Sequence, residues 1–86
     1  MEKIEKIFMF VIENPVNKEE GIIAANMDGS WIPFVGSDLA RVNKLIPLAN
    51  EIAQQANETY KILYFSNRED VTSLFKSEIY KKQTEQ

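Results

Sequence analysis

The feature that most constrains the fold of this chain is the run from Ile7 to Ile12, in which every residue is apolar. A β-strand turns successive side chains to opposite faces, so the strand predicted at residues 4–13 has two apolar faces. Residues 59–65 show the same two-sided pattern. Strands of this kind are typical of the centre of a sheet whose faces are both covered. We therefore predict these two strands to be the central pair of one sheet. The faces of 4–13 carry Ile4, Phe8, Phe10 and Ile12, and Ile7, Met9 and Val11.

A hairpin is predicted between the two central strands. Residues 21–27 and 30–35 are strand candidates, and the Asp28-Gly29 dipeptide between them favours a type I′ turn. Pro33 cannot donate a ladder hydrogen bond, which places the second strand of the hairpin at a sheet edge or at a bulge. Such blunting protects an edge, so dimerisation through this edge is not expected.

A long amphipathic helix is predicted over residues 39–56. Apolar residues recur there at spacings of three and four, the pattern of a helix with one buried face. Ser37 or Asp38 fits the N-cap, and Asn57 fits a left-handed residue at the C-terminal end. Pro47 removes one backbone hydrogen bond inside this stretch. Because the apolar pattern continues through the proline, we favour one kinked helix over two separate helices.

A second helix is predicted after the strand at 59–65. Ser66 and Glu69 have the spacing of a capping box, and apolar residues then continue to about Tyr80. The predicted order is β-β-β-α-β-α: a single α+β domain over residues 1–82, with a four-stranded, mostly antiparallel sheet packed by two helices. Residues 83–86 are expected to be a frayed tail. The long helix joins the third and fourth strands, so either a parallel or a skipped placement remains open.

The coverage of the sheet decides what the surface offers to a partner. If one helix lies on each face, nothing apolar is left over. If the shorter second helix covers only part of a face, apolar sheet surface remains. A monomer rarely exposes a contiguous apolar patch above a few hundred Å². We favour the second case, in which a homodimer or another protein partner covers the remaining surface.

Composition excludes several classes of function. The chain has no cysteine and no histidine, which excludes disulfides, zinc-thiolate sites and thiol nucleophiles, and removes the commonest general base and metal ligand. Its formal net charge is −3, and an acidic balance argues against nucleic acid as a partner. No apolar run approaches the roughly 20 residues that span a bilayer, and no basic-then-apolar leader opens the chain. We expect a cytoplasmic protein without metal, cofactor or membrane association.

A small anion is one candidate ligand. The free N–H groups at the start of a helix favour negative charge, and both predicted helices begin beside serines, Ser37 and Ser66. Arg68, next to Asn67, is placed to clamp a carboxylate or a phosphate. The alternative is that Ser66 only caps its helix and Arg68 pairs with Glu69 or with solvent.

A protein partner is the other candidate. An exposed tryptophan is a typical anchor of an interface, and Trp31 follows directly after the predicted turn. The expected interface residues are Trp31, Phe34, Phe8 and Phe10. The alternative is that Trp31 packs in the core or along an edge strand.

Three functions follow from these patterns. The favoured one is a non-catalytic interaction or regulatory module that self-associates. The second is a sensor of a small ligand or anion that uses the helix N-termini. The third is an enzyme that works without histidine or cysteine, for which no pair of residues has a suggestive spacing. The acidic residues also lack the spacing of a calcium loop.

Overall fold

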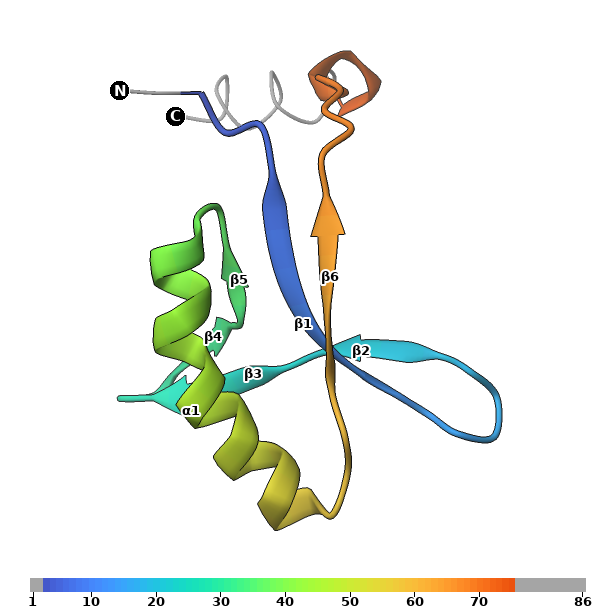
Figure 1. Ribbon diagram of the computed structural model, residues 1–86. Coiled ribbons are helices and arrows are strands. Elements are labelled where there is room, and N and C mark those ends of the chain that lie inside the picture. The colour runs from blue at the N-terminus through green and yellow to red at the C-terminus, as the bar shows by residue number, and fades with distance from the viewer. Residues whose placement is uncertain (1–2, 76–86) are drawn as a thin grey trace.

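The computed structural model describes residues 3–75. Within them, six short strands, one α-helix and one 3₁₀ turn follow one another along the chain (Figure 1). In chain order they are β1 (Ile7–Glu13), β2 (Glu20–Ile22), β3 (Ala24–Met27), β4 (Ser30–Pro33), β5 (Val35–Gly36), α1 (Leu39–Ala56), β6 (Lys61–Phe65) and η1 (Thr72–Phe75).

Strand β1 is the centre of the main sheet. One of its edges pairs antiparallel with β6, with Met9 opposite Leu63. The other edge is shared, because β5 pairs with the first half of β1 and β2 with its second half, both antiparallel. Strands β5 and β6 therefore run parallel to each other with β1 between them. The sequence left open a parallel or a skipped placement, and the structure combines them: β5 and β6 are parallel but not adjacent.

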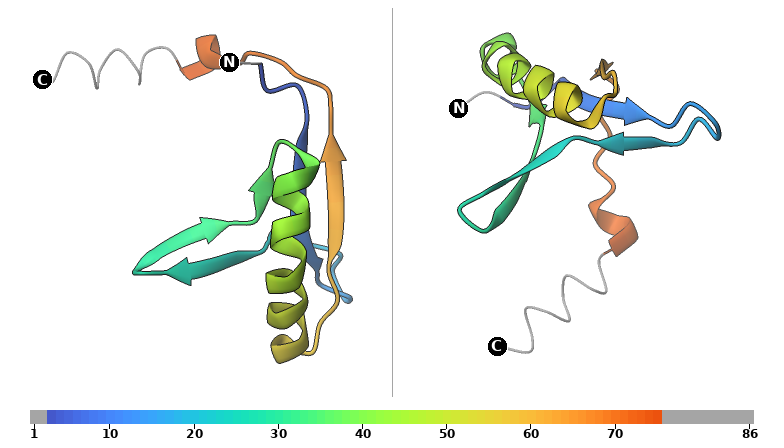
Figure 2. Two further views of the ribbon diagram at one scale, coloured as in Figure 1. Left: turned by 60° about the vertical axis from the view of Figure 1, so that its left-hand side comes forward. Right: turned by 90° about the horizontal axis from the view of Figure 1, so that it is seen from below.

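Three residues connect the main sheet to a separate hairpin. The N–H of Ile23 donates to the carbonyl of Phe10 at 2.9 Å, the N–H of Phe10 to Phe34 at 3.0 Å, and the N–H of Phe34 to Ile23 at 2.8 Å. Ile23 lies between β2 and β3, and Phe34 lies between β4 and β5. This triangle of hydrogen bonds keeps β2 and β5 on β1. Within residues 3–75, β3 and β4 pair only with each other, and they project away from the sheet (Figure 2). The predicted strands at 21–27 and 30–35 are thus each divided in two.

The turn of the hairpin has the predicted geometry. Asp28 has a φ of 53° and Gly29 a φ of 86°, the positive values that a type I′ turn requires at both central residues. The side-chain oxygen of Asn26 accepts a hydrogen bond from the N–H of Gly29 at 3.1 Å. Pro33 lies in β4, whose only partner among the described residues is β3, so it occupies an edge as predicted.

Helix α1 runs without interruption through Pro47, and the prediction of one helix over two is confirmed. Asp38 is its N-cap, because the Oδ1 atom of Asp38 accepts from the N–H of Arg41 at 2.8 Å. Asn57 ends it in the left-handed conformation with a φ of 54°. A bend at Pro47 stays a prediction. As the one α-helix among residues 3–75, α1 is not apolar enough to cross a membrane.

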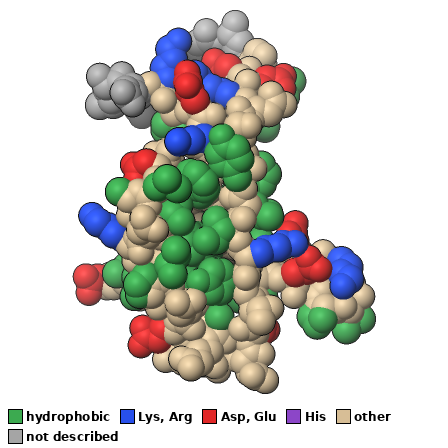
Figure 3. Space-filling view, viewed as in Figure 1, with side chains coloured by type: hydrophobic (Ala, Val, Ile, Leu, Met, Phe, Trp, Pro, Cys, Tyr) green, Lys and Arg blue, Asp and Glu red, His purple; other side chains and the backbone are tan. Residues whose placement is uncertain are grey.

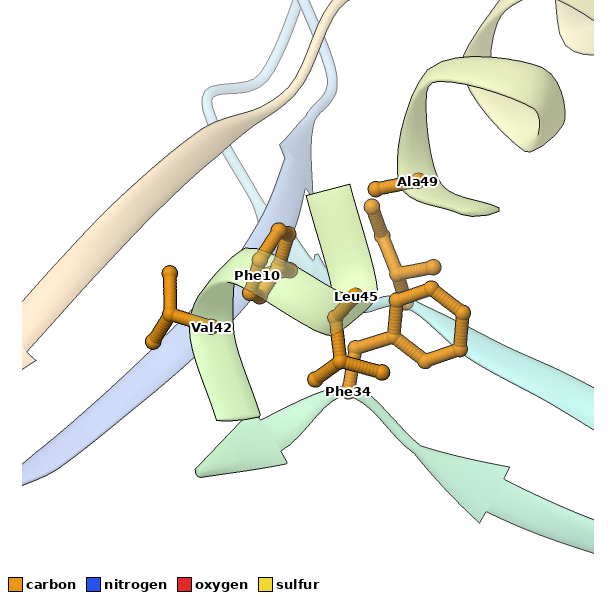
Figure 4. Close-up of a cluster of buried hydrophobic side chains, with 6 residues drawn as sticks. Phe10, Phe34, Val42, Leu45 and Ala49 are labelled. Atoms are coloured by element: carbon orange, nitrogen blue, oxygen red, sulfur yellow. The ribbon is translucent and has the colours of Figure 1, made fainter. Parts of the chain in front are cut away.

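The core lies between α1 and one face of the sheet (Figure 4). It is closed by apolar side chains from β1, the two junction residues and the buried side of α1: Phe10, Ile23, Phe34, Val42, Leu45 and Ala49. The rings of Phe10 and Phe34 meet edge to face with their centroids 6.0 Å apart, a favourable geometry for aromatic pairs. The hydroxyl of Tyr60 donates to Asn50 of α1 at 2.6 Å, which holds the start of β6 against the helix.

The predicted second helix is not found where the capping-box spacing placed it, and the predicted packing of the sheet by two helices is wrong. Residues 66–71 are not helical, and Thr72–Phe75 form only a 3₁₀ turn with exposed side chains. The cap of this turn is Asp70, whose Oδ1 accepts from the N–H of Thr72 at 3.0 Å. The rest of the predicted helix, to Tyr80, and the tail at 83–86 lie outside the described residues.

The predicted central pair of strands is also corrected. β1 is central, but β6 pairs only with β1 within the described part of the chain and is therefore an edge strand. The alternation in β6 places apolar side chains on both faces of the sheet. It does not show whether another strand pairs with each edge of β6.

Candidate functional site

The first candidate surface is the part of the sheet that α1 leaves uncovered. Residues directly opposite in a ladder share a face, so Ile62 and Tyr64 of β6 lie on the same face as Phe10 and Phe8. Helix α1 covers Phe10, but Ile62 remains 38% exposed and Tyr64 57% exposed. Figure 3 shows hydrophobic side chains gathered between α1 and β6. The rings of Phe8 and Tyr64 lie 5.2 Å apart, so this surface is continuous across β1 and β6.

The opposite face of the sheet is apolar as well. Figure 2 shows α1 on one side of the sheet, and residues 3–75 contain no other α-helix to cover the second side. Phe65 of β6 is 48% exposed there, and Leu63 is partly buried. The register places further apolar residues of the neighbouring strands on this face: Ile7, Met9, Val11, Ile22 and Val35. Strand β6 therefore presents apolar side chains on both sides, and we call Ile62, Leu63, Tyr64 and Phe65 the β6 surface.

One charged side chain crosses the second face. The ammonium of Lys61 lies 2.7 Å from Oε2 of Glu13 and 2.9 Å from Oε2 of Glu20. Hydrogen bonds to Glu13 and Glu20 raise the pKa of Lys61 to about 12. The hydrogen bond and the charge of Lys61 hold the pKa of Glu13 below its ordinary value. This network connects β6, β1 and β2, and it directs the charge of Lys61 inward over the sheet.

The second candidate is a polar cleft beside the start of β1. Its volume is about 830 Å³. Ser37, Ser66 and Arg68, three of the four predicted ligand residues, line it together with Lys3 and Lys6. The remaining lining residues are Ile4, Glu5, Asp38 and Tyr64. Asn67, the fourth predicted residue, lines an adjoining, smaller hollow of about 230 Å³, which shares Ser66 and Arg68 with the cleft.

Charge in the cleft favours an anion only modestly. Lys3, Lys6 and Arg68 oppose two carboxylates, Glu5 and Asp38, which leaves a single net positive charge in a chain of net charge −3. Within residues 3–75, none of the three cations lies in an ion pair. Sequence reasoning missed Lys3 and Lys6. The available signal was that both lysines come just before the central strand. Antiparallel pairing brings the start of that strand beside the ends of β5 and β6.

The predicted interface residues fall into two groups. Phe10 and Phe34 are buried in the core, where their side chains contact the chain itself. Trp31 on β4 is 70% exposed and Phe8 is partly buried, so these two remain accessible to a partner. Trp31 belongs to the hairpin of β3 and β4, which projects away from the main sheet (Figure 2).

Comparison with known proteins supplies no family. No family model matches the sequence, and no match was found among curated proteins or solved structures. Within the described residues, no group of three or more acidic side chains is arranged to hold a metal ion. The function therefore has to be inferred from the surface of this structure.

Proposed function

We propose that this chain is a non-catalytic interaction module that self-associates through the β6 surface. The observation that carries the proposal is the exposure of large apolar side chains on both faces of one edge strand, Ile62 and Tyr64 on one and Phe65 on the other. Burying apolar surface contributes about 25 cal/mol per Å². An interface of ordinary size, about 1,600 Å² in total, requires an apolar centre, which these side chains provide.

Composition supports a role in binding over one in catalysis. The chain has no histidine and no cysteine, so acid–base or nucleophilic chemistry would rest on carboxylates, lysines or hydroxyl groups alone. A chain free of cysteine suits a reducing compartment, and the cytoplasm remains our proposed location.

Absolute mass in solution tests this function. Light scattering across a tenfold dilution should give a mass near twice 9.9 kDa for the native chain. Phe65→Asp places a charge in the proposed interface and should shift the mass toward the monomer. Trp31→Ser removes an exposed aromatic ring from the hairpin of β3 and β4 and serves as the matched control, which should stay dimeric. A native chain that remains monomeric at millimolar concentration would overturn the proposal.

A second candidate function is the binding of a small anion in the cleft. The observation that favours it is the convergence of Lys3, Lys6 and Arg68 with two serine hydroxyls in one hollow. Inorganic phosphate is the first probe, followed by carboxylic acids and nucleotides. Ligand at a hundred times its dissociation constant adds about 2.7 kcal/mol of stability, which a thermal-shift measurement detects. The shift should disappear in Arg68→Ala and persist in Lys44→Ala, a change on α1 outside the cleft. The absence of a shift in the native chain would exclude these ligands.

A further inference from the structure

No strand within residues 3–75 pairs with the outer edge of β6, and the hydrogen bonds of the core show which backbone groups point to that edge. Phe10 directs both its N–H and its carbonyl toward Phe34 and Ile23, on the β2 and β5 side of β1. In an antiparallel ladder, successive residues direct these groups to alternate sides. Met9 and Val11 therefore direct theirs toward β6. Their partners in the ladder are Leu63 and Lys61, so these two β6 residues bond to β1.

The intervening residues of β6 point the other way. Ile62 and Tyr64 direct their N–H and carbonyl groups outward, away from β1. No strand within residues 3–75 pairs with that side of β6. Four backbone hydrogen-bonding groups thus line an edge that also carries exposed apolar side chains. Such a row is a template for the addition of another strand.

The edge of β6 lacks the usual protection against strand pairing. Proteins blunt exposed edges with prolines, bulges or charged side chains. Pro33 does so in β4, whereas β6 has no proline and no glycine. Its one charge, on Lys61, is held over β1 and β2 by Glu13 and Glu20, away from the free edge.

We propose that β6 pairs antiparallel with β6 of a second copy of this chain, with Leu63 opposite the partner's Leu63 on the twofold axis. This inference rests on the proposed self-association and specifies its geometry. A twofold interface must be self-complementary, and β6 satisfies this condition in the proposed register. The resulting strand order across the dimer is β1-β6-β6-β1, with both helices on the same side of one continuous sheet.

Backbone directions select the register. Ile62 lies opposite the partner's Tyr64, and since both direct their groups outward they form a pair with two hydrogen bonds. The twofold axis repeats this pair, which makes four bonds. A shift by one residue would place outward groups opposite residues that already bond to β1. A shift by two residues in either direction would keep only one such pair within the two strands, either Tyr64 with the partner's Tyr64 or Ile62 with the partner's Ile62, and so two bonds in place of four.

The side chains agree with this register. Ile62 packs beside the ring of the partner's Tyr64 on the helix side, an apolar cross-strand pair. On the other side, Phe65 lies opposite the partner's Lys61, and the two leucines meet at the axis. No like charges face each other directly.

Two variants of one residue test the backbone pairing. Tyr64→Pro removes an N–H that points to the free edge, a position where a strand tolerates proline. Tyr64→Ala removes the same side chain but keeps the N–H. We expect Tyr64→Pro to be a folded monomer by circular dichroism and light scattering, and Tyr64→Ala to form a weakened dimer. A Tyr64→Pro variant that dimerises as strongly as Tyr64→Ala would overturn the edge pairing.

A cysteine on the axis tests the register. The two leucines form a non-hydrogen-bonded pair, with Cα atoms about 4.5 Å apart, within the range of a disulfide. The native chain has no cysteine, so oxidised Leu63→Cys should run as a covalent dimer without reductant. Asn43→Cys, on the exposed side of α1, is the control and should stay uncrosslinked.

If the native chain is dimeric but Leu63→Cys does not crosslink and Tyr64→Pro remains dimeric, self-association stands and this pairing is wrong. A monomeric native chain overturns both.

Discussion

The ammonium of Lys61 on β6 lies 2.9 Å from the carboxylate of Glu20 on β2, although β1 separates the two strands. The side chains of Lys61 and Glu20 therefore meet over the central strand. Val11 of that strand is opposite Lys61 on one side and Ile22 on the other. Val11 is buried, although no helix within residues 3–75 lies over this face of the sheet. The register places the aliphatic stem of Lys61 beside Val11 on this face, and such stems cover apolar surface while their charge stays solvated.

Two substitutions separate the stem of Lys61 from its charge. Lys61→Met keeps an unbranched apolar side chain over Val11 and loses the ion pairs, whereas Lys61→Ala loses both. We expect Lys61→Ala to lower the urea midpoint more than Lys61→Met, because exposed ion pairs contribute little and the cover of Val11 contributes more. Equal midpoints for the two variants would contradict the covering role.

The same network predicts a dependence of stability on pH. Lys61 lowers the pKa of Glu13 from its ordinary value of 4.5. A lowered pKa in the folded state adds stability above pH 4.5, and this contribution is lost as the pH falls through the folded value. Denaturation between pH 2 and 6 should therefore show a smaller acid-induced loss in Glu13→Gln than in the native chain. Glu51→Gln changes an exposed residue of α1 and is the control. Its acid-induced loss of stability should equal that of the native chain.

At alkaline pH, the stability that this network contributes falls as the pH rises. The pKa of Lys61 is raised from 10.5 to about 12 by Glu13 and Glu20. Its contribution is fully present below pH 10.5 and is lost as the pH rises through 12. Lys61→Met should therefore lose less stability at alkaline pH than the native chain. An equal loss in the two chains would contradict this contribution of Lys61.

Local signals in the sequence predicted local structure correctly. The turn at Asp28-Gly29 and the caps at Asp38 and Asn57 depend on hydrogen bonds to residues a few positions away. A sequence shows such neighbours directly. The capping-box spacing at Ser66 is also local, but a helix there needs tertiary packing to persist, and residues 66–71 have no helix.

Long-range pairing was beyond sequence reasoning. Nothing about Ile23 or Phe34 distinguishes them from other strand residues. They divide their strands only because both bond to Phe10, which lies far away in the chain. The alternation in β6 likewise shows which faces are apolar but not which edges are paired. The convergence of Ser37 with Arg68 in one cleft depended on the same unknown pairing.

The junction at Phe34 should be the most sensitive part of the molecule. Its ring is buried against Phe10, and truncating a buried phenylalanine to alanine costs about 3–5 kcal/mol. A domain of this length has a total stability of about 4–13 kcal/mol. Phe34→Ala should therefore lose between about a quarter and all of the free energy of unfolding in urea titration. Trp31→Ala, in the exposed hairpin, should change it by no more than about 0.5 kcal/mol. Similar losses in both variants would show that the hairpin is packed in solution.

The turn of the hairpin gives a test that leaves side-chain packing untouched. Gly29 has a φ of 86°, and no atom lies within 4 Å of the Cβ that an alanine would add. Gly29→Ala therefore reports the cost of the left-handed conformation alone, and we expect a loss of about 1 kcal/mol. Gly21→Ala is the matched control: its Cβ also meets open space, but its φ is not positive. This variant should be neutral or slightly stabilising, because alanine restricts the unfolded chain. If both variants lost the same stability in urea titration, the turn would not have the geometry described.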